Sequence, residues 1–232
     1  MKHLGAAAAA PHSESGRDTR DVARPRDGTR AHGTTVAPSR RVTLPRLRTD
    51  APPEYERLQR SRSLLLLDQA RIQAWQRLLF VECGDGWIVE EAWRRARRGY
   101  ACGVDTSAAL VARATALRGV PGALEFKTWD GSCLSFPTAF FQAVMATLPW
   151  DQREDARAPL GEMYRVLQPG GHIYLLSSPD LVPSLVATLG RVGFQEAGEL
   201  TRCAVDLTGG AYATSVITHA RAAPAPDTCG RA

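Results

Sequence analysis

The first candidate site is a short turn, Glu82-Cys83-Gly84-Asp85-Gly86, which follows the apolar run 78–81. Two glycines one residue apart let the main chain pass close to a ligand, and the N–H groups that open the following helix can bind a polar or anionic group. A glycine pair after a strand is equally compatible with a plain tight turn. All five residues are therefore candidate ligand contacts only in combination with further motifs.

Two carboxylates follow at the ends of the next two expected strands. Asp105, with Thr106 beside it, stands where an acidic side chain can accept both hydroxyls of a ribose. Asp105 or Thr106 could instead simply cap the next helix. Asp130, in Asp130-Gly131 after the third expected strand, could accept from an exocyclic adenine amine, although an Asp-Gly pair is more often only a turn.

The longest motif is the segment Glu-Met-Tyr-Arg-Val-Leu-Gln-Pro-Gly-Gly at 162–171. Its pattern predicts a helix over 158–167 that docks an apolar side on a sheet. We expect the helix to stop at Pro169-Gly170-Gly171, where proline and glycine oppose its continuation. A buried strand over 172–177 should follow.

These segments need a scaffold that brings strand ends together. Strands are expected over 78–83, 100–104, 124–127, 141–148 and 172–177, separated by helices over 88–98, 107–117, 158–167 and 181–192. This alternation predicts an α/β fold, a single doubly wound and mostly parallel sheet with helices on both faces. A closing hairpin over 199–206 and 211–220 should add an antiparallel strand at the edge.

An amphipathic helix should precede the first strand and reach about Trp75. Its expected apolar positions are Tyr55, Leu58, Leu64, Leu65 and Ile72.

The net positive charge of the chain lies in its first fifty residues. Residues 1–50 contain ten Lys or Arg and five Asp or Glu, whereas the remaining residues contain nineteen of each kind. We expect a disordered basic tail over 1–50, a folded domain over 51–222 and a disordered C-terminal tail over 223–232. Since the folded part is neutral, it offers no general support for binding nucleic acid. The tail could serve as a transit segment, a basic tether or a plain solvated extension.

The five cysteines are scattered without a CxxC pair, which argues against a disulfide framework and against a zinc site. No apolar run approaches the length of about 20 residues that a membrane span needs. The expected compartment is the cytoplasm, with no metal and no membrane partner. Nothing in the sequence specifies an oligomeric state.

In order and spacing, the four segments resemble those of class I S-adenosylmethionine-dependent methyltransferases, in particular the branch that acts on small molecules. Gly84-x-Gly86 resembles the family's first glycine motif, and Gly-Val-Asp-x-Ser at 103–107 its ribose-binding motif. Trp-Asp-Gly at 129–131, followed by Leu-x-Phe-Pro at 134–137, resembles its adenine-binding segment. Residues 162–171 resemble its E-x-x-R-V-L-x-P-G-G run. The resemblance covers about residues 75–220.

The resemblance implies a Rossmann-like sheet of seven strands with the seventh antiparallel, S-adenosylmethionine as cofactor and an unidentified small-molecule acceptor. Two departures stand out. Glu82 takes the place of the family's first glycine, or of its acidic residue if the register shifts by two, and Gln142 replaces a frequent Asp. In either register Glu82 is the carboxylate able to meet the cofactor's ammonium group. Ala146, at the end of the fourth expected strand, completes the candidate cofactor contacts.

Methyl transfer depends mainly on alignment of the acceptor, so a dedicated base is optional and no catalytic residue is assigned. Candidates for such a base, near the end of the fourth expected strand and in the loop beyond it, are Thr147, Trp150 and Asp151. A second hypothesis is a catalytically silent methyltransferase-like domain with a binding or regulatory role, motivated by Glu82 and Gln142. A nicotinamide-dependent oxidoreductase is disfavoured because Val89 stands where GxGxxG needs glycine.

Overall fold

The computed structural model describes residues 53–97, 99–147, 156–207 and 211–224. The expected N-terminal tail lies outside these residues, and the expected C-terminal tail lies almost wholly outside them. The limits expected for the domain therefore stay predictions.

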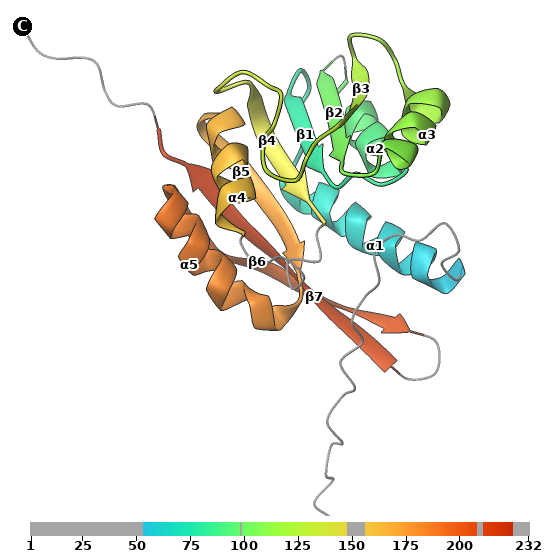
Figure 1. The fold of residues 1–232 in the computed structure, drawn as a ribbon. Helices are drawn as coiled ribbons and strands as arrows, with labels where there is room; N and C mark the ends of the chain where they lie inside the picture. Colours follow the sequence, from blue (N-terminus) through green and yellow to red (C-terminus); the bar gives the residue numbers. More distant parts are fainter. Residues whose placement is uncertain (1–52, 98, 148–155, 208–210, 225–232) are drawn as a thin grey trace, which may run out of the picture. The chain divides into compact units, whose positions relative to one another are not determined.

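Seven strands form one sheet in the order β3-β2-β1-β4-β5-β7-β6 (Figure 1). Strands β1 to β5 are mutually parallel, and β7 runs antiparallel to both of its neighbours, β5 and β6. The expected α/β sheet, with its closing hairpin, is confirmed. The strands are β1 (Arg77–Val81), β2 (Tyr100–Asp105), β3 (Leu124–Thr128), β4 (Phe141–Ala146), β5 (Leu167–Ser177), β6 (Phe194–Leu207) and β7 (Ala211–Ala222).

Helices cover both faces of this sheet. The helices are α1 (Pro53–Ala70), α2 (Trp87–Arg95), α3 (Ala108–Arg118), α4 (Arg157–Val166) and α5 (Val182–Val192), with a short 3₁₀ turn at Pro179–Leu181. Buried side chains of α1, α2 and α3 pack in one apolar cluster with one face of the strands. Buried side chains of α4 and α5 pack in a second cluster with the other face. The parallel strands are therefore buried on both sides, as their near-continuous apolar sequences require.

The first helix differs from the expected one in its end and in part of its buried stripe: Leu58, Leu65 and Ile72 contact the core as expected, and Leu64 does not. It ends at Ala70, where Arg71 takes a left-handed φ of 45°, and not near Trp75. Leu58, Leu66 and Leu67 are buried, whereas Leu64 is 36% exposed. The four leucines at 64–67 extend around a whole turn of the helix, so periodicity alone could not show which of them face the sheet.

The Pro-Gly-Gly segment belongs to a strand and does not form a helix stop. Helix α4 ends at Val166, and β5 begins at Leu167 and runs through Pro169, Gly170 and Gly171. The pairing of β4 with β5 is irregular here, passing from Phe141↔Leu167 to Ala143↔His172, so proline removes no regular ladder bond. A Cβ at Gly171 would lie 2.9 Å from the Gln168 carbonyl oxygen, so the bulged strand requires glycine.

A histidine pair links the middle of β5 to β7. His172 Nδ1 lies 2.9 Å from His219 Nε2, and the Tyr174 ring lies 4.9 Å from the His219 ring. Burial lowers the pKa of both imidazoles; Arg221 further lowers that of His172, and His172 further lowers that of His219. One hydrogen shared between two neutral rings fits this geometry.

This pair should make stability depend on pH. An unfolded chain would take up protons as the pH falls below the ordinary imidazole pKa of about 6.5, before the folded protein does. The free energy of unfolding should therefore be highest above that pH and decline as the pH falls to 5. In His219→Gln the decline should be shallower, as measured by urea unfolding at successive pH values. Equal slopes for the variant and the unchanged protein would contradict the assignment.

Candidate functional site

The turn after β1 alternates left-handed residues. Glu82, Gly84 and Gly86 have φ angles of 57°, 59° and 78°. The three left-handed positions match a motif with three alternating glycines, which favours the register that places Glu82 at the first of them. A glutamate held there costs on the order of 1–3 kcal/mol in backbone strain.

Close packing requires glycine at position 86 of the turn and at position 103 of β2. A Cβ at Gly86 would lie 2.5 Å from Cε1 of Phe126 in β3. A Cβ on Gly103 of β2 would lie 2.7 Å from the Cys83 sulfur. The turn thus rests directly on β2 and β3. Burial, reinforced by the Asp105 charge, raises the pKa of the Cys83 thiol, so this side chain packs as a neutral group.

The Asp105 carboxylate joins the turn to the end of β2. This residue is 5% exposed. Its Oδ2 accepts the Gly84 N–H at 2.9 Å, and its Oδ1 accepts the Ser107 N–H at 2.9 Å. The helix cap expected from Asp105 or Thr106 comes from Ser107, whose Oγ accepts the Leu110 N–H at 3.4 Å.

The side chain of Glu82 extends from the end of β1 across the end of β2 toward β3. The hydroxyl of the exposed Thr106 lies 3.5 Å from Glu82 Oε2. The indole N–H of the buried Trp129 donates to Glu82 Oε1 at 3.3 Å. The structure therefore brings the first three sequence motifs together around one partly exposed carboxylate.

The Asp130 carboxylate shapes the loop after β3. Its Oδ1 accepts from the Ser132 N–H at 2.8 Å, the Ser132 hydroxyl at 3.0 Å and the Cys133 N–H at 2.7 Å. These bonds lower its pKa, so the exposed carboxylate is ionised at neutral pH. Gly131 follows with a φ of 87°. The expected turn role of Asp-Gly is therefore present, and the exposed carboxylate is a possible acceptor as well.

A clamp from α4 holds the next part of that loop. Arg165 donates to the carbonyl oxygens of Leu134 and Phe136, both at 2.8 Å. Glu162 Oε2 accepts the Leu134 N–H at 2.9 Å and pairs with Arg165 at 2.7 Å. The ion pair lowers the pKa of Glu162 and raises that of Arg165. The sequence identified the Glu-x-x-Arg motif at 162–165. It could not show that both side chains bind the loop at 134–136, which follows the Trp-Asp-Gly motif.

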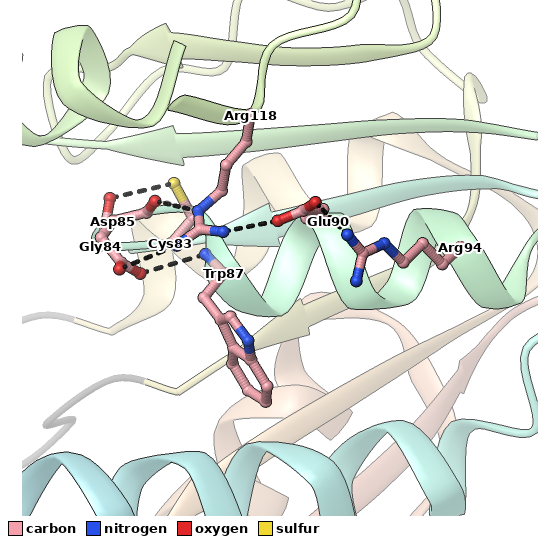
Figure 2. Close-up of polar contacts among 7 residues, drawn as sticks. All are labelled: Cys83, Gly84, Asp85, Trp87, Glu90, Arg94 and Arg118. Atoms are coloured by element: carbon pink, nitrogen blue, oxygen red, sulfur yellow. Dashed lines mark hydrogen bonds and ion pairs between the residues drawn. The ribbon is translucent and has the colours of Figure 1, made fainter. Parts of the chain in front are cut away.

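A second clamp, not expected from the sequence, holds the glycine turn from α3 (Figure 2). Arg118 donates to the Asp85 carbonyl at 3.0 Å and pairs with the Asp85 carboxylate at 3.3 Å. It also pairs with Glu90 of α2 at 2.5 Å, and Glu90 in turn binds Arg94 at 2.6 Å. Asp85 Oδ1 accepts the Trp87 N–H at 3.1 Å, which fixes the first turn of α2.

Helix α1 lies beside the same turn. The Arg60 guanidinium lies 5.4 Å from the centre of the Trp87 ring, and Figure 2 shows Trp87 directed from the turn toward α1. The segment before the first strand therefore borders the site.

The other candidate positions lie at opposite ends of the parallel strands, some at the carboxyl ends and one at the amino ends. Ala146 ends β4 and is buried, and the partly exposed Thr147 follows it at the carboxyl edge. Trp150 and Asp151 lie outside the described residues. Gln142 lies near the start of β4, where its Oε1 accepts the Arg77 N–H at 2.7 Å. This substitution lies at the amino edge, away from the candidate site.

Other kinds of site find little support in the part of the chain that is described. No group of three or more His, Cys, Asp or Glu side chains could hold a metal ion among these residues. Cys83, Cys102, Cys133 and Cys203 are free thiols. No described helix is both long and apolar enough to cross a membrane.

An arginine-rich hollow lies at the amino edge of the sheet, away from the three motifs. Its volume is about 560 Å³, and it is bordered by Leu67, Asp68, Arg71, Ile72, Gln73, Arg94, Arg95 and Arg97. Arg94 and Arg95 are paired with carboxylates of Glu90, Glu91 and Asp68.

Comparison with known proteins gives a domain match and a curated relative. Residues 79–171 match the family model described as a methyltransferase domain. The demethylmenaquinone methyltransferase of Thermus thermophilus is 30% identical over 132 residues, which cover 56% of this chain and 59% of the relative. The match thus spans about three fifths of the length of that relative.

Solved structures share the fold. An S-adenosylmethionine-dependent methyltransferase from Mesorhizobium loti aligns with a TM-score of 0.56 at 18% identity, covering 68% of this chain and 96% of the other. The [4+2]-cyclase SpnF aligns with a TM-score of 0.56 at 20% identity, covering 73% and 82%. At these identities the likeness extends to the fold alone, and one fold supports more than one chemistry.

Replacing Arg118 by Met should loosen the glycine turn. The partly buried guanidinium makes three contacts with the turn and α2, so its loss should cost about 1–2 kcal/mol in the free energy of unfolding. Amide hydrogen exchange at residues 84–88 should accelerate. Arg113→Met, on an exposed position of the same helix, should stay within about 0.5 kcal/mol. Equal amide exchange rates at residues 84–88 in Arg118→Met and Arg113→Met would contradict this role of Arg118.

Replacing Arg165 by Met should release the loop at 134–136 in the same way. Two carbonyl oxygens lose their donor and Glu162 loses its ionic partner, so amide exchange should rise in this loop while that of the glycine turn is unchanged. Arg191→Met is the control, since the hydrogen bonds that Arg191 makes with described residues lie within its own helix. If exchange rose equally throughout the sheet, the side chain would serve general stability and not this loop.

Proposed function

We propose that this chain, whose residues 79–171 form a methyltransferase domain of the class I fold, binds S-adenosylmethionine and methylates a small molecule. One observation carries the proposal: the ends of β1, β2 and β3 present a glycine turn and three carboxylates at a single edge of the sheet. That edge lies where ligands bind in doubly wound folds.

The donors and acceptors at this edge suit the cofactor. S-adenosylmethionine presents an ammonium group, a ribose diol and an adenine amine, all of which donate hydrogen bonds. Glu82, Asp105 and Asp130 supply carboxylate acceptors in that neighbourhood. The main chain at 83–86, together with Thr106, Gly131 and Ala146, would line the remaining contacts. The N-terminus of α2, the positive end of its helix dipole, suits the cofactor's carboxylate.

The bound cofactor would supply a methyl group activated by a positively charged sulfur. In the transfer, a nucleophilic atom of the acceptor bonds to the methyl carbon as the carbon–sulfur bond breaks, and its electron pair stays on sulfur. Any proton on the acceptor atom passes to solvent or to a nearby base. The protein's share is to hold the acceptor in line and to exclude water, which can account for much of the rate. Helix α1 and Thr147 border the space where the acceptor would lie.

The small-molecule class of acceptor rests on two observations. The curated relative is named for methylation of demethylmenaquinone, a small molecule. The charge of residues 51–232 is balanced, which gives a phosphate backbone no particular attraction. We further propose a reducing compartment such as the cytoplasm, in keeping with the free thiols.

A second candidate function is a methyltransferase-like domain that binds a ligand or partner without catalysis. It is favoured by Glu82, a charged side chain at a position where the resembling family has glycine. Because that side chain extends over the ends of β2 and β3, it lies in the space a nucleoside would use.

Calorimetry with the full chain tests the proposal. S-adenosylmethionine and S-adenosylhomocysteine should bind with micromolar dissociation constants, about −8 kcal/mol. Asp105→Ala should weaken binding at least about tenfold, since the Gly84 and Ser107 N–H groups lose a charged acceptor. Glu199→Gln, an exposed site on β6, is the matched control and should bind as the unchanged protein does.

Turnover then decides between the two candidate functions. Incubation with S-adenosylmethionine and small acceptors, beginning with demethylmenaquinone, should yield methylated product by mass spectrometry. A folded chain that binds neither cofactor form would contradict the proposal and support the silent domain.

A further inference from the structure

We infer that the arginine-rich hollow at the amino edge of the sheet is a second binding site, for a small molecule that carries a diphosphate or triphosphate group. Arg71, after α1, and Arg97, after α2, would bind the phosphates. The volume of the hollow, about 560 Å³, is that of a small-molecule site. The inference goes beyond the proposed function, because the hollow lies at the opposite end of the strands from the glycine turn.

Two of the arginines that border the hollow are held by carboxylates. Arg94 pairs with Glu90 at 2.6 Å. Arg95 pairs with Asp68 of α1 at 2.6 Å and with Glu91 at 3.1 Å. The pair between Arg95 and Asp68 also ties the end of α2 to the end of α1. These two arginines therefore form part of the wall and contribute little net charge.

Arg71 and Arg97 supply the net positive charge of the hollow. Both side chains are exposed and border it, and neither forms an ion pair with another described residue. A guanidinium has several N–H donors in one plane, an arrangement that matches the oxygens of a phosphate. Since the two arginines belong to separate segments, each can bind a different phosphate of one ligand. No ion pair between described residues has to break for this binding.

The backbone holds both arginines in a conformation that disfavours them. Arg71 directly follows α1, and Arg97 lies two residues past the end of α2; their φ angles are 45° and 30°. Helices often end in a left-handed residue, which is usually glycine because other side chains are strained there. Here arginine occupies such a position after two helices, and both side chains border one hollow. This strain is a reason to assign the two side chains a task.

Main-chain hydrogen bonds join the two segments that carry these arginines. The Trp75 N–H donates to the Ala96 carbonyl oxygen at 2.8 Å, which binds the segment after α1 to the segment after α2. The Gln73 side chain donates to the Arg71 carbonyl oxygen at 2.7 Å. A ligand would therefore meet two cationic positions that are already held side by side, which reduces the entropy lost on binding.

An arginine at the carboxyl end of a helix can also offset the negative end of the helix dipole. That role accounts for a cation after either helix, but it requires neither a left-handed residue nor a shared hollow. The two roles differ in the effect of glycine at positions 71 and 97. If the arginines only offset the dipoles, glycine lowers stability; if they bind phosphate, glycine abolishes binding and relieves strain.

The test is calorimetric titration of the full chain with sodium tripolyphosphate at about 0.15 M salt, which screens weak surface binding. The unchanged protein should bind with a dissociation constant below about 1 mM. Arg71→Gly/Arg97→Gly should bind at least about tenfold more weakly, the effect of losing charge-assisted hydrogen bonds. Its melting temperature should stay within about 3 °C of the original, because glycine adopts both φ angles freely.

A second variant and a control complete the test. Arg71→Gln/Arg97→Gln, which removes the charges but retains side chains, should weaken binding to the same extent. Arg113→Gln/Arg191→Gln removes the same charge from exposed positions of α3 and α5 and should bind as the unchanged protein does. Tripolyphosphate should also slow amide exchange at residues 70–76 and 94–97 of the unchanged protein.

Several results would overturn the inference. Full binding by Arg71→Gly/Arg97→Gly would place the anion elsewhere, the basic residues 1–50 included. Equal weakening in the control would mean that binding follows net charge alone. Citrate bound as tightly as tripolyphosphate would show a site without preference for phosphate. Absence of binding by the unchanged protein would leave the dipole role. None of these results depends on binding of S-adenosylmethionine, so the proposed function is tested separately.

Discussion

The buried carboxylate of Asp105 is the interaction on which the arrangement of this site depends. One of its oxygens accepts the Gly84 N–H in the turn after β1, and the other accepts the Ser107 N–H just before α3. Removing a carboxylate from water is expensive unless hydrogen bonds replace the lost hydration, and two main-chain N–H groups provide that replacement here. The left-handed turn at 82–86 is thereby held against β2, and Glu82 is directed across the sheet edge.

The site is braced from both faces of the sheet. Arg118, from the α1–α3 face, holds the glycine turn, while Glu162 and Arg165, from the α4–α5 face, hold the loop after β3. Arg118 binds one main-chain carbonyl oxygen and Arg165 two, and each also pairs with a carboxylate, which is a use suited to the several donors of a guanidinium. The loops that would contact the cofactor are thus positioned by side chains that need not touch it.

Much of the fold followed from the sequence because the parallel strands are short apolar runs between glycine-marked turns. The order of elements and the closing hairpin were predicted on that basis. The predictions from sequence failed where one local pattern was compatible with two different structures. The leucine run at 64–67 fitted several helical faces, and Pro169-Gly170-Gly171, predicted to be a helix stop, forms a bulged start of β5. For the site, residue types indicated which strand ends matter. Long-range partners such as Arg118 with Asp85 depend on packing that no local spacing encodes.

The two arginine clamps share no residue, and they lie on different helices at opposite faces of the sheet. We therefore expect the glycine turn and the loop after β3 to open and close independently of each other. The fraction of molecules ready to bind a ligand is then the fraction with a closed turn multiplied by the fraction with a closed loop. Weakening either clamp would reduce apparent affinity in proportion, with no compensation from the other. Ligand affinity in this protein would then be adjustable from two distant helices, neither of which needs to contact the ligand.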